Sequence, residues 1–210
     1  MKRVLALIGP TLFLLAEIIL PGGSADPATR MAIIQNHGPA WALGHLIIAL
    51  ALVFLLMWVG EVYGYVRPGN ELTAFLGLFL STFALASDYA VAMLQLLALE
   101  LVRTQPATMV LQVLETVGRS SSLLALAFLP TLGFFFGFGV LAIGVYRKTR
   151  QILPASLLTL AGLLIAVAGV VQIKIVFVLG ALALFLFALL FAGTAWRKDP
   201  SSQPVVNPAG

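Results

Sequence analysis

The chain has 210 residues, of which 61% are hydrophobic and 10% are charged, and its formal net charge is +4. Soluble domains contain about half apolar and a quarter charged residues, so this composition indicates an integral membrane protein without a sizeable soluble catalytic domain. The absence of cysteine excludes disulfides, thiolate metal sites and cysteine nucleophiles. The Lys and Arg residues flank apolar stretches rather than form a patch, so nucleic acid is not an expected partner.

Six apolar stretches are suited to crossing the ~30 Å hydrocarbon core of a bilayer as helices. They lie at about residues 4–20, 41–60, 72–99, 123–146, 152–171 and 175–196. The sequence therefore predicts an all-α fold, a six-helix membrane bundle that occupies residues 1–198. The remaining residues, 199–210, hold three prolines and few apolar side chains and are expected to form a disordered tail.

The first apolar stretch allows two interpretations. Lys2 and Arg3 precede residues 4–20, and the small residues 23–25 follow it, which is the order found in a cleaved signal peptide. However, the stretch contains Glu17, is long for the apolar part of a signal peptide and is followed by further spans. We therefore expect it to be retained as the first membrane helix.

Two shorter helices are expected outside the spans. Asp26-Pro27 is typical of a helix start and Gly38-Pro39 of a helix stop, which predicts a short surface helix between them. Further on, apolar residues recur with the spacing of one helical face at Val110, Val113, Leu114 and Val117. This amphipathic segment is either a separate helix at the membrane interface or the water-exposed beginning of the fourth span. Residues 118–120 are a possible break between the segment and the span.

The orientation of the bundle follows from its basic residues. With the N-terminus in the cytoplasm, the cytoplasmic side holds Lys2, Arg3, Arg67, Arg147, Lys148, Arg150, Arg197 and Lys198. The outer side then holds only Arg30, Arg103, Arg119 and Lys174. Since cytoplasmic loops carry an excess of Lys and Arg, this distribution predicts that both termini are cytoplasmic.

Asp88 is the only charged residue in the third stretch, residues 72–99. A carboxylate near the middle of a membrane helix costs several kcal/mol in lipid, about 3 kcal/mol on insertion scales, so Asp88 is expected to face protein or water. Ser81 and Gln95 lie seven residues to either side, and two helical turns return a side chain to nearly the same face. One stripe of this helix is therefore polar.

Glu17 and His45 occupy similar depths in the first two spans. At ~1.5 Å per residue, Glu17 lies ~7 Å, His45 ~8 Å and Asp88 ~4 Å outward of the middle of its span. Because consecutive helices are usually neighbours, we expect these groups to converge on one cavity in the outward half, with Tyr89 and Gln95 able to join them.

This polar cluster has two possible roles. A structural cluster would hydrogen-bond a carboxyl group to His45 and to Ser81 or Ser87, and so hold three helices in register. A functional cluster would exchange a proton or accept a cationic ligand, since ionisable residues inside membranes are candidates for functional sites. The sequence leaves both roles open.

Other chemistries find little support. The chain has no glycine-rich phosphate loop and no HExxH motif, and residues 120–122, all serines, have no assignable general base, so we expect a non-enzyme. His45 is the only histidine inside a span, which argues against haem ligation, and no cofactor is expected. The spacing of Gly133 and Gly137 instead predicts close packing of the fourth span on another helix.

Two segments carry a resemblance to known proteins. The first runs from Gly9-Pro10-Thr11-Leu12-Phe13 to Glu17, and the second is His37-Gly38-Pro39-Ala40-Trp41-Ala42-Leu43-Gly44-His45. In these segments the chain resembles small bacterial six-helix integral membrane proteins of unknown function. The resemblance implies a bacterial six-span bundle and brings no catalytic residues with it.

Taken with the polar cluster, these features favour a small transporter or ligand-binding bundle in the bacterial cytoplasmic membrane. The alternative is a structural or accessory subunit of a larger membrane complex. Membrane lipid is the expected partner in either case, together with other membrane subunits or further copies of the chain.

Overall fold

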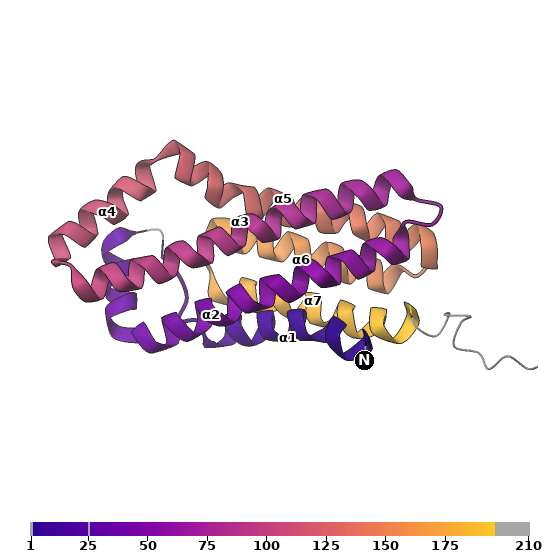
Figure 1. Ribbon diagram of the computed structural model, residues 1–210, viewed down its shortest axis with the longest axis horizontal. Coiled ribbons are helices and arrows are strands. Elements are labelled where there is room, and N and C mark those ends of the chain that lie inside the picture. Colours follow the sequence, from indigo (N-terminus) through magenta and orange to yellow (C-terminus); the bar gives the residue numbers. More distant parts are fainter. Residues whose placement is uncertain (1, 25, 196–210) are drawn as a thin grey trace, which may run out of the picture.

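The computed structural model describes residues 2–24 and 26–195, with side chains described outside residues 2–6, 118, 121–127 and 194–195. This part of the chain is almost entirely helical and contains no strand (Figure 1). Its helices are α1 (Lys2–Ile19), α2 (Pro27–Val66), α3 (Glu71–Thr104), α4 (Ala107–Arg119), α5 (Ser121–Thr149), α6 (Ile152–Val171) and α7 (Lys174–Ala195). The predicted all-α fold is therefore confirmed for the described residues.

Five helices in the described part of the chain are long and apolar enough to cross a membrane, as expected of a membrane protein. They are α2, α3, α6 and the segments Phe128–Thr149 of α5 and Lys174–Gly193 of α7. The predicted span at residues 4–20 corresponds to α1, whose described apolar part, Leu7–Ile19, is shorter. The predicted tail, residues 199–210, and the predicted end of the last span at Trp196 lie outside the described residues.

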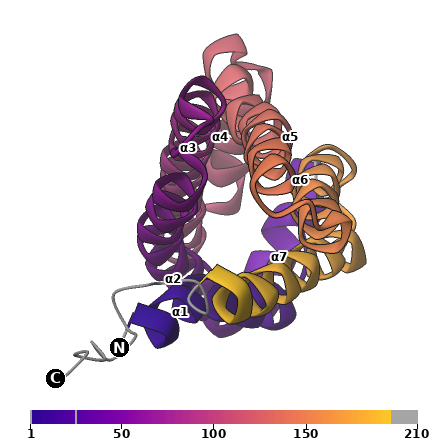
Figure 2. The ribbon, with the colours of Figure 1, turned by 90° about the vertical axis from the view of Figure 1, so that its right-hand side faces the viewer.

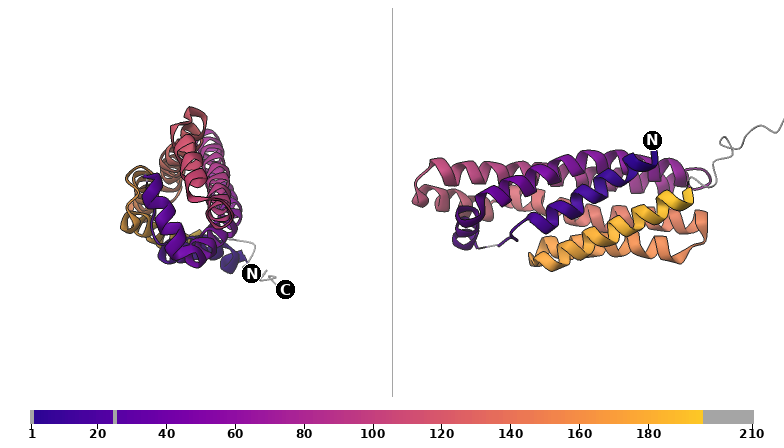
Figure 3. Two further views of the ribbon diagram at one scale, coloured as in Figure 1. Left: turned by 90° about the vertical axis from the view of Figure 1, so that its left-hand side faces the viewer. Right: turned by 90° about the horizontal axis from the view of Figure 1, so that it is seen from below.

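Six of the helices form a closed ring in the order α1, α2, α3, α5, α6 and α7, with α7 packed on α1. Figure 2 shows this ring end-on, and Figure 3 shows α1 and α7 side by side. α4 lies outside the ring at one end, where it contacts α2, α3 and α5. The helices that pack on one another in the ring therefore surround a central axis that no helix occupies.

The predicted surface helix before Gly38-Pro39 is continuous with the next span and forms the first part of α2. Asp26 caps its start, since the Thr29 hydroxyl and the Thr29 N–H donate to the Asp26 carboxylate over 2.6 and 2.8 Å. These two hydrogen bonds lower the pKa of Asp26. At His37 the backbone leaves helical geometry (φ −128°, ψ 26°), so α2 kinks there rather than ending. Figure 1 shows the segment before the kink turned across the long axis of the bundle.

The amphipathic segment at residues 110–119 is a separate helix, α4, which ends at Arg119. Its apolar residues Val110 and Leu114 are buried in a small core against the first part of α2 and the far end of α3. The residues of this core that are most buried are Ile34, Trp41, Ala98, Leu99, Val110 and Leu114. α3 is 34 residues long, or ~51 Å, so it extends beyond the 20-residue α6 and carries α4 at its far end.

The opposite half of the ring is filled by a larger core with aromatic side chains at its centre. Trp58 of α2 meets Phe138 of α5 and Phe187 of α7 edge-on, with ring centroids 6.2 and 5.6 Å apart. All three side chains are almost completely buried. We call these three residues the aromatic plug, because they close the ring axis on the side away from α4.

The two glycines predicted to pack closely lie against α3. A Cβ atom at Gly133 would lie 2.5 Å from the Cβ atom of Ala84, and one at Gly137 would lie 2.7 Å from the backbone nitrogen of Ser81. Both distances are shorter than real Cβ contacts, so only glycine lets the backbones of α3 and α5 approach this closely. At these two positions α5 packs directly against the backbone of α3.

Candidate functional site

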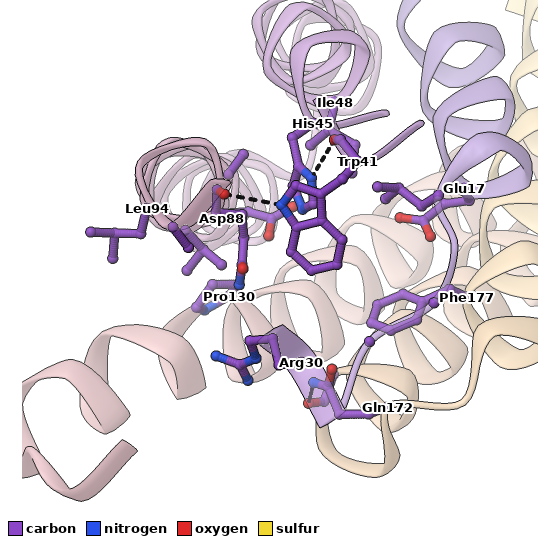
Figure 4. Close-up of a pocket in the computed structure, with 18 of the residues that line it drawn as sticks. Glu17, Arg30, Trp41, His45, Ile48, Asp88, Leu94, Pro130, Gln172 and Phe177 are labelled. Carbon is purple, nitrogen blue, oxygen red and sulfur yellow. Dashed lines mark hydrogen bonds between the residues drawn. The ribbon is translucent and has the colours of Figure 1, made fainter. Parts of the chain in front are cut away.

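A cavity of about 380 Å³ lies in the half of the ring that the aromatic plug does not fill (Figure 4). Its lining comes from all seven helices and from Gly22 and Gly23 in the link between α1 and α2. A volume of this size is within the range of small-molecule sites. On one side the cavity is lined by Phe134, which packs against Phe138 of the plug, and α4 with the first part of α2 lies at the other.

Four of the five predicted site residues line this cavity. They are Glu17 of α1, His45 of α2, and Asp88 and Gln95 of α3. The structure does not bring Tyr89 to the cavity, since its side chain is 42% exposed and is not part of the lining. Tyr89 follows Asp88 directly, and consecutive residues of a helix point about 100° apart. It is therefore carried onto the outer surface of the ring.

Glu17 is buried but has no hydrogen-bond partner in the described structure. Its side chain is only 7% exposed and borders the cavity, as Figure 4 shows. No hydrogen bond or ion pair joins Glu17, His45 and Asp88 to one another among the described residues. Because a buried polar group without a partner is costly, Glu17 marks a place where a bound molecule would complete the hydrogen bonding.

The serines proposed to bind the carboxyl groups do not do so. The Ser87 hydroxyl donates to the Phe83 carbonyl within α3 over 2.9 Å. The Ser81 hydroxyl is fully buried next to Gly137 and has no partner in the described structure. A cluster that held three helices in register would need hydrogen bonds between them, and these polar groups do not form such bonds.

Trp41 lines the cavity and forms hydrogen bonds within its wall, a role that the sequence did not predict. Its indole N–H donates to the Gln95 carbonyl over 3.0 Å, which joins α2 to α3. Its own carbonyl lies 2.8 Å from Nδ1 of His45, and the two rings are 4.7 Å apart. Because a carbonyl oxygen only accepts, Nδ1 carries a hydrogen, and Nε2 is the ring nitrogen left for another partner.

Two cations also line the cavity, and sequence analysis had assigned them only to the outer side of the membrane. Arg30 lies in the first part of α2, where its Nε donates to the Ser24 carbonyl over 3.0 Å. Lys174 begins α7, and its ammonium group donates to the Ile18 carbonyl over 3.0 Å. Both groups come from helix ends or links and lie at the mouth of the cavity. Lys174 is also near Glu17, since it binds the carbonyl of the next residue and its charge acts on the Glu17 carboxylate, although no ion pair joins them among the described residues. We refer to Arg30 and Lys174 as the mouth cations.

The remaining wall is apolar. α4 contributes Val113, Leu114 and Val117 from its apolar face, and the far end of α3 contributes Leu94, Leu97 and Leu101. Phe13 and Phe134 line the cavity nearer to the plug. In the part of the chain that the structure describes, no group of three or more His, Asp or Glu side chains is placed to hold a metal ion.

Comparisons of this chain with protein-family models, with curated proteins and with solved structures find no match.

Proposed function

We propose that the chain is a small ligand-binding protein or transporter of the bacterial cytoplasmic membrane, and not an enzyme. Its ligand occupies the cavity between Glu17, His45 and Asp88, in the outward half of the bundle. The observation that carries this proposal is the buried Glu17, which borders a cavity of about 380 Å³ without a hydrogen-bond partner. Intramembrane ionisable groups that face a cavity commonly belong to substrate or ion pathways.

The proposal includes six membrane spans with both termini in the cytoplasm. α1 is then the first span, because it completes the ring between α2 and α7, and the cavity faces outward. The excess of Lys and Arg at the ends of α2, α5 and α7 supports this orientation.

This topology is tested with single cysteines, since the natural chain has none. Ala28→Cys and Lys148→Cys place a thiol at opposite ends of the bundle, at exposed positions. In intact cells, a membrane-impermeant maleimide is expected to label Ala28→Cys and to label Lys148→Cys only after the membrane is permeabilised. The reverse pattern would contradict the proposed orientation.

A second cysteine pair tests whether the cavity is open to water. Thr131 lines the cavity, whereas Ala161 of α6 is 0% exposed in the filled half. Small methanethiosulfonate reagents are expected to modify Thr131→Cys at least tenfold faster than Ala161→Cys in the folded protein. Equally slow modification of both variants would point to a solid bundle and thus to the accessory-subunit alternative.

The alternative of an accessory subunit predicts a free face of small residues for a partner helix. Gly133 and Gly137 are not available for that purpose, since both lie against α3 within the same chain. This packing favours the proposal of a ligand cavity over that of an accessory subunit.

A further inference from the structure

The charges around the cavity are arranged so that the base is acidic and the mouth is basic. Glu17 and Asp88 face the cavity, and neither forms an ion pair with a cation among the described residues. The mouth cations are held instead by backbone carbonyls, through the bonds of Arg30 to Ser24 and of Lys174 to Ile18. The charge of Lys174 acts on Glu17, but no hydrogen bond from the described residues reaches the carboxylates of Glu17 and Asp88. A protonated amine would supply such bonds with its three N–H groups.

The apolar side of the cavity lies along α3 and α4. Leu94 and Leu97 line the cavity and are 40% and 54% exposed, so these side chains border both the cavity and the outer surface of α3. Figure 4 shows Leu94 at the edge of the site, away from Glu17. In Figure 1, α4 leaves the far end of α3 and meets α5 at a corner that stands away from α3. This side of the cavity is lined by uncharged, mainly aliphatic residues from α3 and α4.

The basic mouth and the apolar side of the cavity favour the entry of different molecules. A cation that approaches through the aqueous mouth must pass Arg30 and Lys174, which repel it. A molecule that enters along α3 passes mainly aliphatic side chains and the uncharged Gln95 before it reaches Asp88. The charge distribution therefore favours a ligand that carries its positive charge on an apolar chain and arrives from the membrane.

We propose that the ligand is an amphiphilic amine whose ammonium group lies between Glu17 and Asp88, and whose hydrocarbon chain runs along Leu94, Leu97 and α4 toward the lipid. This inference rests on the proposed function and specifies its ligand. His45 presents Nε2 to the same space and can accept a further hydrogen bond from the amine.

The test uses brominated chains, because bromine quenches tryptophan fluorescence at short range and Trp41 lines the cavity. The purified protein in lipid nanodiscs is titrated with 6,7-dibromododecylamine, 6,7-dibromododecanol, 6,7-dibromododecanoic acid and 3-bromopropylamine, so that the bromine lies close to the headgroup. The long-chain amine is expected to quench saturably with an affinity at least tenfold higher than each of the other three probes. This quenching is expected to be lost in Trp41→Phe, which assigns it to the cavity.

Charge-removing variants locate the amine. Glu17→Gln and Asp88→Asn are each expected to weaken binding of the long-chain amine at least tenfold and to leave the weak quenching by the alcohol unchanged. Glu100→Gln is the matched control, since Glu100 is exposed near the end of the same α3 and does not line the cavity. It is expected to bind the amine as the natural chain does.

The other outcomes overturn the inference in distinguishable ways. Equal affinity for 3-bromopropylamine would identify a small soluble amine and remove the role of the apolar wall. Tighter binding of the acid, lost in Arg30→Gln, would identify the mouth cations as the headgroup site. No saturable quenching by any probe would reject an amphiphilic ligand, whereas the proposed function itself would fail only if Thr131→Cys were as unreactive as Ala161→Cys.

Discussion

Replacing Gly137 with leucine is expected to prevent recovery of a folded, monodisperse protein. A Cβ atom at this position would lie 2.6 Å from the Ser81 hydroxyl and 2.7 Å from the Ser81 nitrogen. Overpacking inside a core typically costs about 1–3 kcal/mol, and here the obstacle includes backbone, which cannot rotate away. We expect α3 and α5 to separate, with an unfolding temperature in detergent far below that of the natural chain.

Gly139 provides the matched control for this substitution. It lies on the same helix, two residues further, and a Cβ atom there would have nothing within 4 Å. Leucine also favours the helix over glycine by roughly 1 kcal/mol, so Gly139→Leu is expected to be neutral or slightly stabilising. Similar unfolding temperatures for Gly137→Leu and Gly139→Leu, measured by size-exclusion chromatography after heating, would show that the contact between α3 and α5 is not tight.

Removing the indole of Trp58 is the second change for which we expect a large loss of stability. Trp58 is 1% exposed and contacts the rings of Phe138 and Phe187 at the centre of the aromatic plug. Substitution of a buried large aromatic residue by alanine typically costs about 3–5 kcal/mol, because the cavity that remains does not collapse completely. Trp58→Ala is therefore expected to unfold at markedly lower temperature or denaturant concentration.

Phe79→Ala tests whether burial, rather than aromatic content, sets this cost. Phe79 of α3 is 57% exposed on the outside of the ring. Because lipid replaces the lost contacts there, Phe79→Ala is expected to change the free energy of unfolding by less than about 1 kcal/mol. A loss as large as that of Trp58→Ala would mean that the plug contributes no more than the outer surface.

The helices and the depth of the polar groups were predictable because the cost of burying charge in lipid is large. That cost places Glu17, His45 and Asp88 toward the interior, and all three line the cavity. It gives no information on the direct neighbours of each group, which depend on side-chain geometry. The three groups line one cavity, but no direct hydrogen bond joins them among the described residues.

Residues that combine local and tertiary roles were harder to predict. A tryptophan at the start of an apolar stretch is typical of an anchor at the membrane surface. Trp41 links α2 to α3 because the Gln95 carbonyl lies within reach of its indole N–H, which the local sequence does not show. Gly38-Pro39 has the composition of a helix stop, but α2 continues through a kink at His37 because its first part packs against α3 and α4. Both outcomes depend on contacts with segments more than 50 residues away, which local patterns do not contain.

The pairing of α1 with α7 has a consequence for biosynthesis. In the six-span topology proposed above, the wall between α1 and α7 forms only after the five helices that follow α1 in the ring have been inserted into the membrane. Until then the Glu17 side of α1 lacks its later neighbour, and the ring is an open arc with the acidic base of the cavity accessible to lipid. Membrane insertion and cavity closure are thus separate events. A chain interrupted before α7 would expose Glu17 and Asp88, whose charges are costly in lipid, to the bilayer.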